Sequence, residues 1–281
     1  MRSLLLIVLV LLVSSTACAE DLVLVNGVVI DGTGKMRAAA NLRIKDDKIA
    51  DIGIFKAALN ETTLDVKGMI IAPGFVDVQG LQPASPLITQ GITTTILGSD
   101  GTGPYSVEDF MLPFDDRPPV ANIAMLVGHA TVRRQIMGSD FKRSATANEL
   151  RLMEELVSDA MKQGAFGFAS NLQQEPASFS SHDERVALAK VVAKFGGIVV
   201  VRSHDATEPI AIAREAKVAV QVLDTEKSVL AEIEKARAQH VDISAEVYSF
   251  PQLAQEKPVS FERAIPRLSS APASRFGLHD R

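Results

Sequence analysis

The side chains that could bind a metal ion or move a proton are few in this chain and lie far apart. The chain has five histidines, and no two of them are spaced to bind one metal ion together. Asp100 and Asp224 each follow a β-branched run, and His204 follows a third. Because parallel strands end at one edge of a sheet, these residues are candidates for an active site there. Asp224 and His204 are the candidate catalytic groups, and Asp100 and Asp224 the candidate metal ligands.

Each of these candidates also has a structural interpretation. Aspartate at the end of a strand is a favoured N-cap of the helix that follows, which applies to both Asp100 and Asp224. A single histidine in a loop, such as His204, is often an ordinary surface residue. The sequence by itself leaves both alternatives open.

Two further side chains could bind a substrate. His129 follows the apolar run at 121–127, so it is expected at the strand edge where a substrate would lie. Arg133, four residues later, could hold a substrate carboxylate with its planar fork of N–H donors. The alternatives are a structural histidine and a surface ion pair.

The elements that must position these residues alternate between strands and helices from Ile70 onward. Apolar or β-branched runs predict strands at 92–98, 121–127, 198–201, 218–223 and 241–247, and helical spacing predicts helices at 150–161, 208–216 and 226–238. Thr146 and Glu149 form a capping box, and so do Ser181 and Glu184. Repeated strand–helix units of this kind predict a parallel sheet or barrel.

Residues 21–66 have the pattern of a small β-domain. Asn26-Gly27 predicts a hairpin between strands at 22–25 and 28–30, and Asp46-Asp47 predicts a later turn. The core must be aliphatic, since aromatic residues make up only 5% of the chain and tryptophan is absent. A core of this composition suits a parallel α/β architecture.

The N-terminus has the pattern of a signal peptide. Arg2 precedes ten apolar residues at 4–13, which is too short for a bilayer-spanning helix of about 20 residues, and Ala17-Cys18-Ala19 is a small-x-small cleavage site. We therefore expect an exported protein, periplasmic or secreted, that begins at Glu20. The alternative is a lipoprotein acylated on Cys18, and only then is a membrane an expected partner.

The net charge of the chain limits which macromolecules it is expected to bind. The net charge is −5, and no basic run is present, which argues against nucleic acid as a partner. Removal of Cys18 with the signal peptide would leave the mature protein without cysteine. It would then have neither a disulfide nor a thiolate metal ligand.

Five segments, in order along the chain, carry a resemblance to a known family. They are PGFVD at 73–77, ITQGITT at 88–94, VGHATVRRQIMG at 127–138, QGAFGFAS at 163–170 and LSSAPASRFGLHDR at 268–281. Together they resemble the D-aminoacylase (N-acyl-D-amino-acid deacylase) branch of the amidohydrolase superfamily. The resemblance implies a (β/α) barrel beside a small β-sandwich. It also implies amide hydrolysis of N-acyl-D-amino acids, with a zinc ion at the barrel mouth that activates water.

The same resemblance places the family's metal ligands on residues of other types in this chain. The His-x-His pair falls on Gln79 and Leu81, the cysteine on Asp100, and two later histidines near Arg202 and on Asp224. The family's late catalytic aspartate has no counterpart. A protonated arginine cannot bind a metal, so the resemblance implies a degenerate and internally shortened member without a zinc cofactor.

The sequence therefore predicts an α/β protein with three parts. A signal peptide covers 1–19, and a small β-sandwich portion covers 20–69 together with 268–281. An incomplete amidohydrolase-type (β/α) barrel covers 70–267. The resemblance implies a hydrolase of non-peptide C–N amide bonds whose metal-dependent activity is lost or impaired. The alternative is a non-catalytic exported binding or scaffold protein. The expected partners are a small N-acyl amino acid-like ligand and a second copy of the chain.

Overall fold

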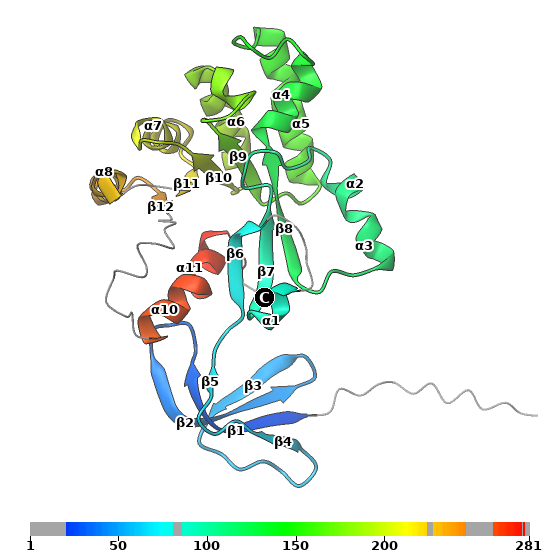
Figure 1. The fold of residues 1–281 in the computed structure, drawn as a ribbon, viewed down its shortest axis with the longest axis vertical. Helices are drawn as coiled ribbons and strands as arrows, with labels where there is room; N and C mark the ends of the chain where they lie inside the picture. The colour runs from blue at the N-terminus through cyan, green and yellow to red at the C-terminus, as the bar shows by residue number, and fades with distance from the viewer. Residues whose placement is uncertain (1–20, 81–85, 224–226, 246–260, 277, 279–281) are drawn as a thin grey trace, which may run out of the picture. The chain divides into compact units, whose positions relative to one another are not determined.

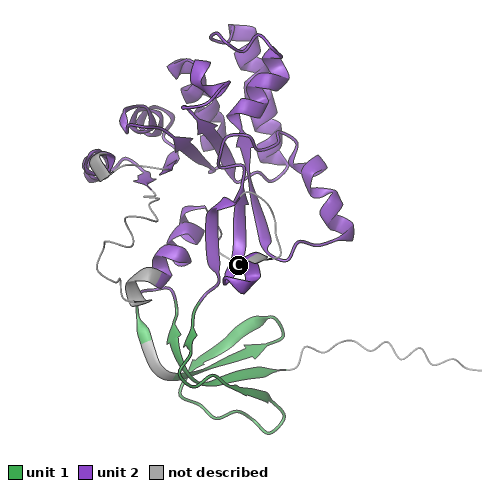
Figure 2. Ribbon diagram, in the orientation of Figure 1, with its two compact units in different colours: residues 1–31, 35–72 green, residues 32–34, 73–281 purple. Residues whose placement is uncertain are grey.

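The computed structural model describes residues 21–80, 86–223, 227–245, 261–276 and 278, which fall into two compact units. The first unit comprises residues 1–31 and 35–72, and the second comprises 32–34 and 73–281 (Figure 2). Of the residues that the sequence analysis joins to the small β-domain, Phe276 and Leu278 are buried in an apolar cluster of the second unit. The predicted domain boundaries otherwise stay a prediction.

The first unit is a mixed β-sheet with the strand order β3-β2-β1-β4, in which β5 also pairs with β1. Its strands are β1 (Leu22–Ile30), β2 (Met36–Lys45), β3 (Lys48–Gly53), β4 (Thr62–Asp65) and β5 (Ile70–Ile71). The turn predicted at Asp46 joins β2 to β3, and Asp46 has a φ of 56°.

The hairpin predicted at Asn26-Gly27 is wrong. Strand β1 runs straight through these residues, and its pairing with β2 shifts register between Leu24 and Gly27. Asn26 has a φ of 64°, so the pair forms a β-bulge. A Cβ atom at Gly27 would lie 2.7 Å from Ile71 Cδ1, so a larger residue here would require the Ile71 side chain to shift.

The second unit contains a seven-stranded parallel sheet, in which the strands follow one another in chain order from β6 to β12 (Figure 1). Its strands are β6 (Phe75–Gly80), β7 (Ile92–Leu97), β8 (Asn122–Gly128), β9 (Gly167–Asn171), β10 (Ile198–Arg202), β11 (Ala219–Leu223) and β12 (Ile243–Ala245). The sheet curls into a half-barrel, which confirms the predicted α/β class and the incomplete amidohydrolase-type barrel.

Side chains of α2 and of α4 to α8, which lie between the strands in the chain, pack in the cluster on one face of the sheet (Figure 1). The helices of this unit are α1 (Pro86–Thr89), α2 (Val107–Met111), α3 (Pro113–Asp116), α4 (His129–Met137), α5 (Ala147–Lys162), α6 (His182–Lys194), α7 (Thr207–Ala216), α8 (Lys227–Ala238), α10 (Phe261–Leu268) and α11 (Ser270–Arg275), with a 3₁₀ turn at Ala177–Phe179. None of the helices in the described part of the chain is long and apolar enough to cross a membrane.

The starts of α5 and α6 show how local sequence defines a helix. Thr146 and Glu149 form the predicted capping box, with both reciprocal hydrogen bonds present. Ser181 caps α6 by accepting a hydrogen bond from the Glu184 backbone N–H. The Glu184 side chain does not complete this second box, because it turns into the protein interior.

Both faces of the parallel sheet are buried, as expected when helices cover one face and other apolar side chains the other. Alternate strand residues such as Val127, Phe168 and Val201 pack against the helices. The strand residues between them, among them Leu126 and Val200, point to the opposite face and form an inner cluster. Phe276 and Leu278, which follow α11, are part of this inner cluster.

Candidate functional site

The carboxyl ends of the parallel strands form the edge at which a barrel protein places its chemistry. Arg202 ends β10 and Gln79 lies near the end of β6. Although β9, β8 and β7 separate these strands in the sheet, Arg202 Nη2 donates a hydrogen bond to Gln79 Oε1 at 3.1 Å. The curvature of the half-barrel brings the two side chains together across its mouth.

An irregularity in β6 accompanies this contact. The pairing with β7 shifts register between Asp77 and Gly80, so three steps along β6 oppose two steps along β7. The Gln79 backbone N–H donates to Asp77 Oδ1 at 3.0 Å, within this irregular stretch. A bulge of this kind re-aims a side chain near an active site.

The two residues that meet are positions at which the family resemblance expects metal-binding histidines. Arg202 has five N–H donors and no lone pair for a metal, and Gln79 offers its oxygen to Arg202. No group of three or more His, Cys, Asp or Glu side chains is arranged to hold a metal within the part of the chain that the structure describes. The residues described at this mouth, Arg202 and Gln79, therefore do not fit a zinc ion.

Asp100, a candidate metal ligand, makes a local turn after β7. Its Oδ1 accepts from the Thr102 backbone N–H at 3.0 Å, and its Oδ2 accepts from Thr102 Oγ1 at 2.7 Å. The N-cap of the helix that follows is Ser106, so Asp100 does not cap that helix. Asp224, the second candidate, lies outside the described residues.

His129 and Arg133 belong to a buried network that links β9, α4 and α6. Neither side chain has any exposed surface, and Glu184 between them is 1% exposed. His129 Nε2 lies 2.8 Å from Glu184 Oε1, and its Nδ1 lies 2.7 Å from Ser170 Oγ. Because a carboxylate only accepts, Nε2 carries the proton, and Ser170 then donates to Nδ1 of the neutral ring.

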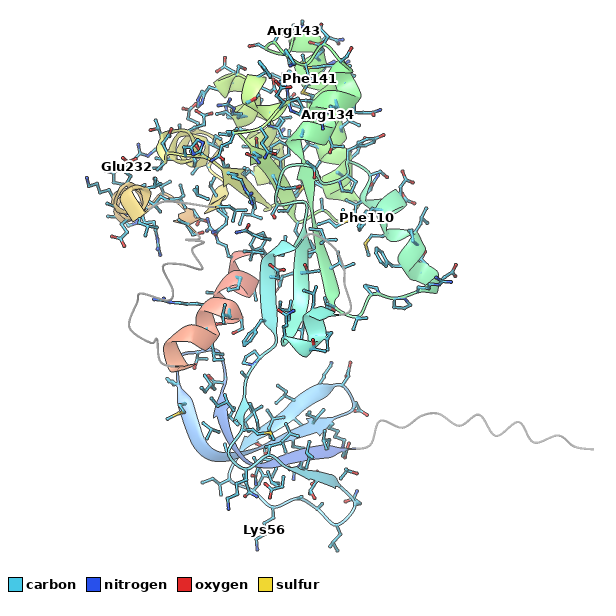
Figure 3. All side chains as sticks on the ribbon, viewed as in Figure 1. Lys56, Phe110, Arg134, Phe141, Arg143 and Glu232 are labelled. Carbon is cyan, nitrogen blue, oxygen red and sulfur yellow. The ribbon has the colours of Figure 1, made fainter. Side chains whose placement is uncertain are left out.

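Arg133 completes the network and ties it to a loop. Its Nη1 donates to both oxygens of Glu184, and its Nη2 donates to the carbonyls of Phe141 and Arg143 at 2.9 and 2.7 Å. Phe141 and Arg143 mark this loop beyond α4 in Figure 3. Since no atom of His129 or Arg133 reaches the surface, we interpret both residues as structural rather than substrate-binding.

Burial and charge act in opposite directions on this network. Burial lowers the pKa of His129, which the hydrogen bond to Glu184 only partly offsets. Burial by itself raises the pKa of Glu184, but the hydrogen bonds and charges of His129 and Arg133 outweigh it and leave that pKa below its usual value. At neutral pH the network therefore holds a neutral histidine, a carboxylate and a guanidinium.

His204 and Asp205 lie in the loop after β10 and line a hollow of about 260 Å³ together with Arg185 and Glu208. The hollow lies at the same edge of the sheet as the Arg202–Gln79 contact. Asp205 Oδ1 accepts from the Thr207 backbone N–H at 2.8 Å, so this carboxylate orders the start of α7. His204 is exposed at the rim.

His182, which the sequence analysis did not select, has the most carboxylate contacts of the histidines in the described residues. Its Nδ1 lies 3.0 Å from Glu208 Oε1 and its Nε2 lies 3.2 Å from Glu215 Oε1. The hydrogen bond to Glu208 raises the pKa of His182, against the effect of partial burial. The only sequence feature that could have selected His182 is its position directly after Ser181, at the start of the predicted helix.

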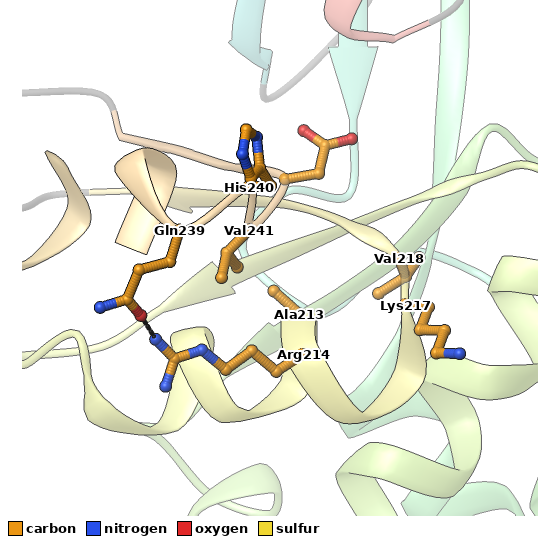
Figure 4. Close-up of a pocket in the computed structure, with 8 residues that line it drawn as sticks. Ala213, Arg214, Lys217, Val218, Gln239, His240 and Val241 are labelled. Atoms are coloured by element: carbon orange, nitrogen blue, oxygen red, sulfur yellow. Dashed lines mark hydrogen bonds between the residues drawn. The ribbon is translucent and has the colours of Figure 1, made fainter. Parts of the chain in front are cut away.

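A larger hollow of about 400 Å³ lies at the opposite edge of the sheet (Figure 4). Val218 and Val241 lie one and two residues before β11 and β12 and form part of its wall. Arg214, Lys217 and His240 surround it. Residues at the amino ends of barrel strands contribute to stability rather than to chemistry. We therefore place the candidate site at the other edge, despite its smaller hollow.

Comparison with known proteins defines the class of this chain. It is 30% identical over 226 residues to a D-aminoacylase of Alcaligenes xylosoxydans xylosoxydans, covering 69% of this chain and 46% of that protein. It is also 30% identical over 279 residues to an N-acyl-D-glutamate deacylase of the same organism, covering 82% of this chain and 57% of that protein. The chain thus spans about half the length of these curated relatives. No family model matches it.

Solved structures agree with these relatives. The chain superposes with a TM-score of 0.74 at 28% identity on a D-aminoacylase described as defining a novel subset of amidohydrolases, covering 82% of this chain and 59% of that one. It superposes equally well, at 26% identity, on an N-acyl-D-glutamate deacylase from Bordetella bronchiseptica complexed with zinc and a phosphonate inhibitor, covering 92% of this chain and 68% of that one. The fold is therefore that of the amidohydrolases.

Within that class, the chain is a homologue of the D-aminoacylases and N-acyl-D-glutamate deacylases. The resemblance drawn from the five sequence segments is thereby confirmed.

Proposed function

We propose that this protein derives from hydrolases of N-acyl-D-amino acids, that its metal-dependent activity is lost or impaired, and that it binds a small N-acyl amino acid-like ligand. The hydrogen bond between Arg202 and Gln79 is the observation that carries the proposal. The resemblance expects a histidine ligand at each of these two positions. In this chain one position holds a cation and the other an amide, and the two side chains contact each other. Zinc, which is bound in the related Bordetella deacylase, would supply an activated water there, and these side chains do not fit it.

The alternative is a hydrolase whose site was rebuilt from Asp100, His129, His204 and Asp224. Three of these residues, Asp100, His129 and His204, are described by the structure, and each has different surroundings. Asp100 bonds within its own turn, His129 is buried in a network, and His204 lies exposed in a loop. No shared position for a substrate follows from these three, which favours the first proposal.

We expect no amine release from N-acetyl-D-amino acids with added zinc, either by the wild type or by the Gln79→His/Leu81→His double variant. Two restored histidines do not make a site when Arg202 still occupies a further ligand position, and members of a catalytic unit act together. Elemental analysis after dialysis should find well under one zinc per chain in the wild type. Zinc-dependent turnover by the wild type that vanishes in Asp224→Ala or His204→Ala would support the rebuilt hydrolase instead.

Export is a separate proposal. It is supported by Arg2, the apolar run at 4–13 and the Ala17-Cys18-Ala19 site. The intact mass of protein recovered from the periplasm or medium is expected to correspond to a chain that begins at Glu20. A mass that includes Met1, or a lipid on Cys18, would contradict cleavage at this site.

A further inference from the structure

His182 lies between two carboxylates of the neighbouring helix. It is the first residue of α6, and Glu208 and Glu215 lie in the first and last turns of α7. The two glutamates are separated by about two helical turns, so they lie on one face of α7. His182 Nδ1 lies 3.0 and 3.1 Å from the two carboxylate oxygens of Glu208, and His182 Nε2 lies 3.2 Å from Glu215 Oε1. The imidazole ring thus joins the start of α6 to α7 through both of its nitrogens.

These contacts determine the protonation state of the ring. An ionised carboxylate only accepts hydrogen bonds, so each ring nitrogen that faces one must carry a proton. A neutral imidazole has one N–H and could donate to Glu208 or to Glu215, but not to both. It would place a lone pair against the other carboxylate. The arrangement therefore requires the charged ring. His129 differs, because one of its nitrogens faces the hydroxyl of Ser170, which can donate to a neutral ring.

The contact with Glu208 connects His182 to the hollow at the carboxyl edge of the sheet. Glu208 and Arg185 line that hollow together with residues of the loop at 203–206, which joins β10 to α7. Arg185 Nη1 lies 3.1 Å from Glu208 Oε1, and hydrogen bonds to the hydroxyl and carbonyl of Ser180 fix Arg185 in place. The Glu208 carboxylate is therefore held from two sides, by Arg185 and by His182.

We propose that His182, with Glu208 and Glu215, forms a pH-dependent latch between α6 and α7, which orders the loop at 203–206 when the ring is charged and loosens it when the ring is neutral. Loss of the ring proton breaks one of the two carboxylate contacts and weakens the hold on the first turn of α7. The loop at 203–206 leads directly into that turn, so it gains freedom with it. The latch thus couples the order of one wall of the hollow to pH.

The direction of the pH dependence follows from the charges around the ring. The hydrogen bond to Glu208 is the largest effect, and it raises the pKa of His182 above its ordinary value of 6.5, against partial burial. The latch is therefore complete below pH 6.5 and is lost as the pH rises through the raised pKa. Arg185 and the amino end of α6 both oppose a charged ring, so the two glutamates must stabilise it. The other charged or titratable side chains close to these groups in the chain are Asp183 and Glu184 of α6, His204 and Asp205 of the loop, Arg214 of α7 and Lys217 after it.

The first test measures backbone amide exchange in the full chain at about pH 6 and about pH 8.5, with rates corrected for the intrinsic effect of pH on exchange. In the wild type, protection of the segment at 203–210 is expected to fall about three- to fivefold between these pH values, as one partly exposed ion pair implies. His182→Gln fixes a neutral side chain at this position. It should show the lower protection at both pH values.

The second test follows the ring itself by NMR titration of the His182 C–H resonances. The midpoint is expected at a lower pH in Glu215→Gln than in the wild type, because one of the two negative partners of the ring is removed. Glu108→Gln is the matched control, since it removes an exposed carboxylate on α2. It should leave the midpoint and the exchange at 203–210 unchanged, which separates the effect of the contact from that of net charge.

Three results would overturn the inference. They are equal protection at 203–210 at both pH values in the wild type, a pH response that persists in His182→Gln, and a His182 midpoint that Glu215→Gln does not lower. The NMR titration tests the latch even if His182→Gln does not fold. None of these measurements depends on turnover or on a bound ligand, so the latch is tested independently of the proposed function.

Discussion

The Glu184→Gln variant is expected to lose about 3–5 kcal/mol of unfolding free energy. The substitution keeps the shape of the side chain but removes the negative charge between His129 and Arg133, and all three groups are buried. The Arg133 guanidinium then stays in the interior without a counter-charge, which is the costly outcome of breaking a buried pair. A loss of this size is a large part of the stability of an ordinary domain, about 5–15 kcal/mol. Urea unfolding followed by circular dichroism measures it.

The matched control is Glu155→Gln on α5. Glu155 pairs with Arg151 one helical turn away, and both side chains are more than half exposed. An exposed pair is screened by water and contributes little, so this variant should unfold like the wild type. Equal midpoints for Glu184→Gln and Glu155→Gln would show that the buried network does not stabilise the fold.

The same network makes stability depend on pH. The pKa values of His129 and Glu184 are both lowered in the folded protein, so each group binds protons more weakly when folded than when unfolded. The stabilisation is therefore complete above the unfolded pKa values. It is expected to decline as the pH falls below 6.5, the ordinary value for histidine, and further below 4.5, that for glutamate. Glu184→Gln should lack the further loss of stability that begins below pH 4.5, because it has no carboxylate to protonate.

The Phe276→Ala variant is expected to lose about 3–5 kcal/mol, the usual cost of removing a buried phenylalanine ring. Phe276 is 5% exposed and packs in the inner cluster with side chains such as Ile96 and Leu126. It therefore covers the apolar inner face of the half-barrel. Arg275, the last residue of α11, holds this segment in place through hydrogen bonds to the Val220 carbonyl and to Asp242.

The control for this prediction is Leu268→Ala at the end of α10. Leu268 is 49% exposed, so its truncation leaves no comparable cavity and should change stability far less. Thermal unfolding of the two variants beside the wild type makes the comparison. If Phe276→Ala melted at the wild-type temperature, the C-terminal segment would not close the inner face as the structure indicates.

Local sequence was sufficient for much of the fold, because the interactions concerned lie within a few residues. The capping box of Thr146 and Glu149 involves neighbours in one turn, and the structure forms it as predicted. The alternation of strands and helices follows from apolar spacing, and it produced the parallel sheet. Self-association of the chain stays a prediction, motivated by β6 and β12 as the two edge strands of the described sheet.

Two local predictions, the second capping box and the hairpin at Asn26-Gly27, differ from the structure because residues distant in the sequence contact these segments. Ser181 and Glu184 have the same spacing as the first capping box, but the Glu184 side chain bonds to His129 and Arg133 instead. A buried guanidinium needs a charged partner more than a helix start needs a second cap. Likewise, Asn26-Gly27 has the sequence of a hairpin and became a bulge, because β1 continues along β2 and packs against Ile71.

The sequence by itself determined the ancestry of this protein and the residue types at the barrel mouth. The five ordered segments identified the relatives, and Gln79 and Arg202 were already visible at positions expected to hold histidines. Only the tertiary structure decided that these two side chains touch, since 123 residues separate them in the chain. It also decided that His129 and Arg133 are buried rather than open to a ligand. The physical reason is the same in both cases: the curvature of the sheet and the packing of its helices determine which strand ends meet and which side chains are covered, and neither property is encoded in a local pattern.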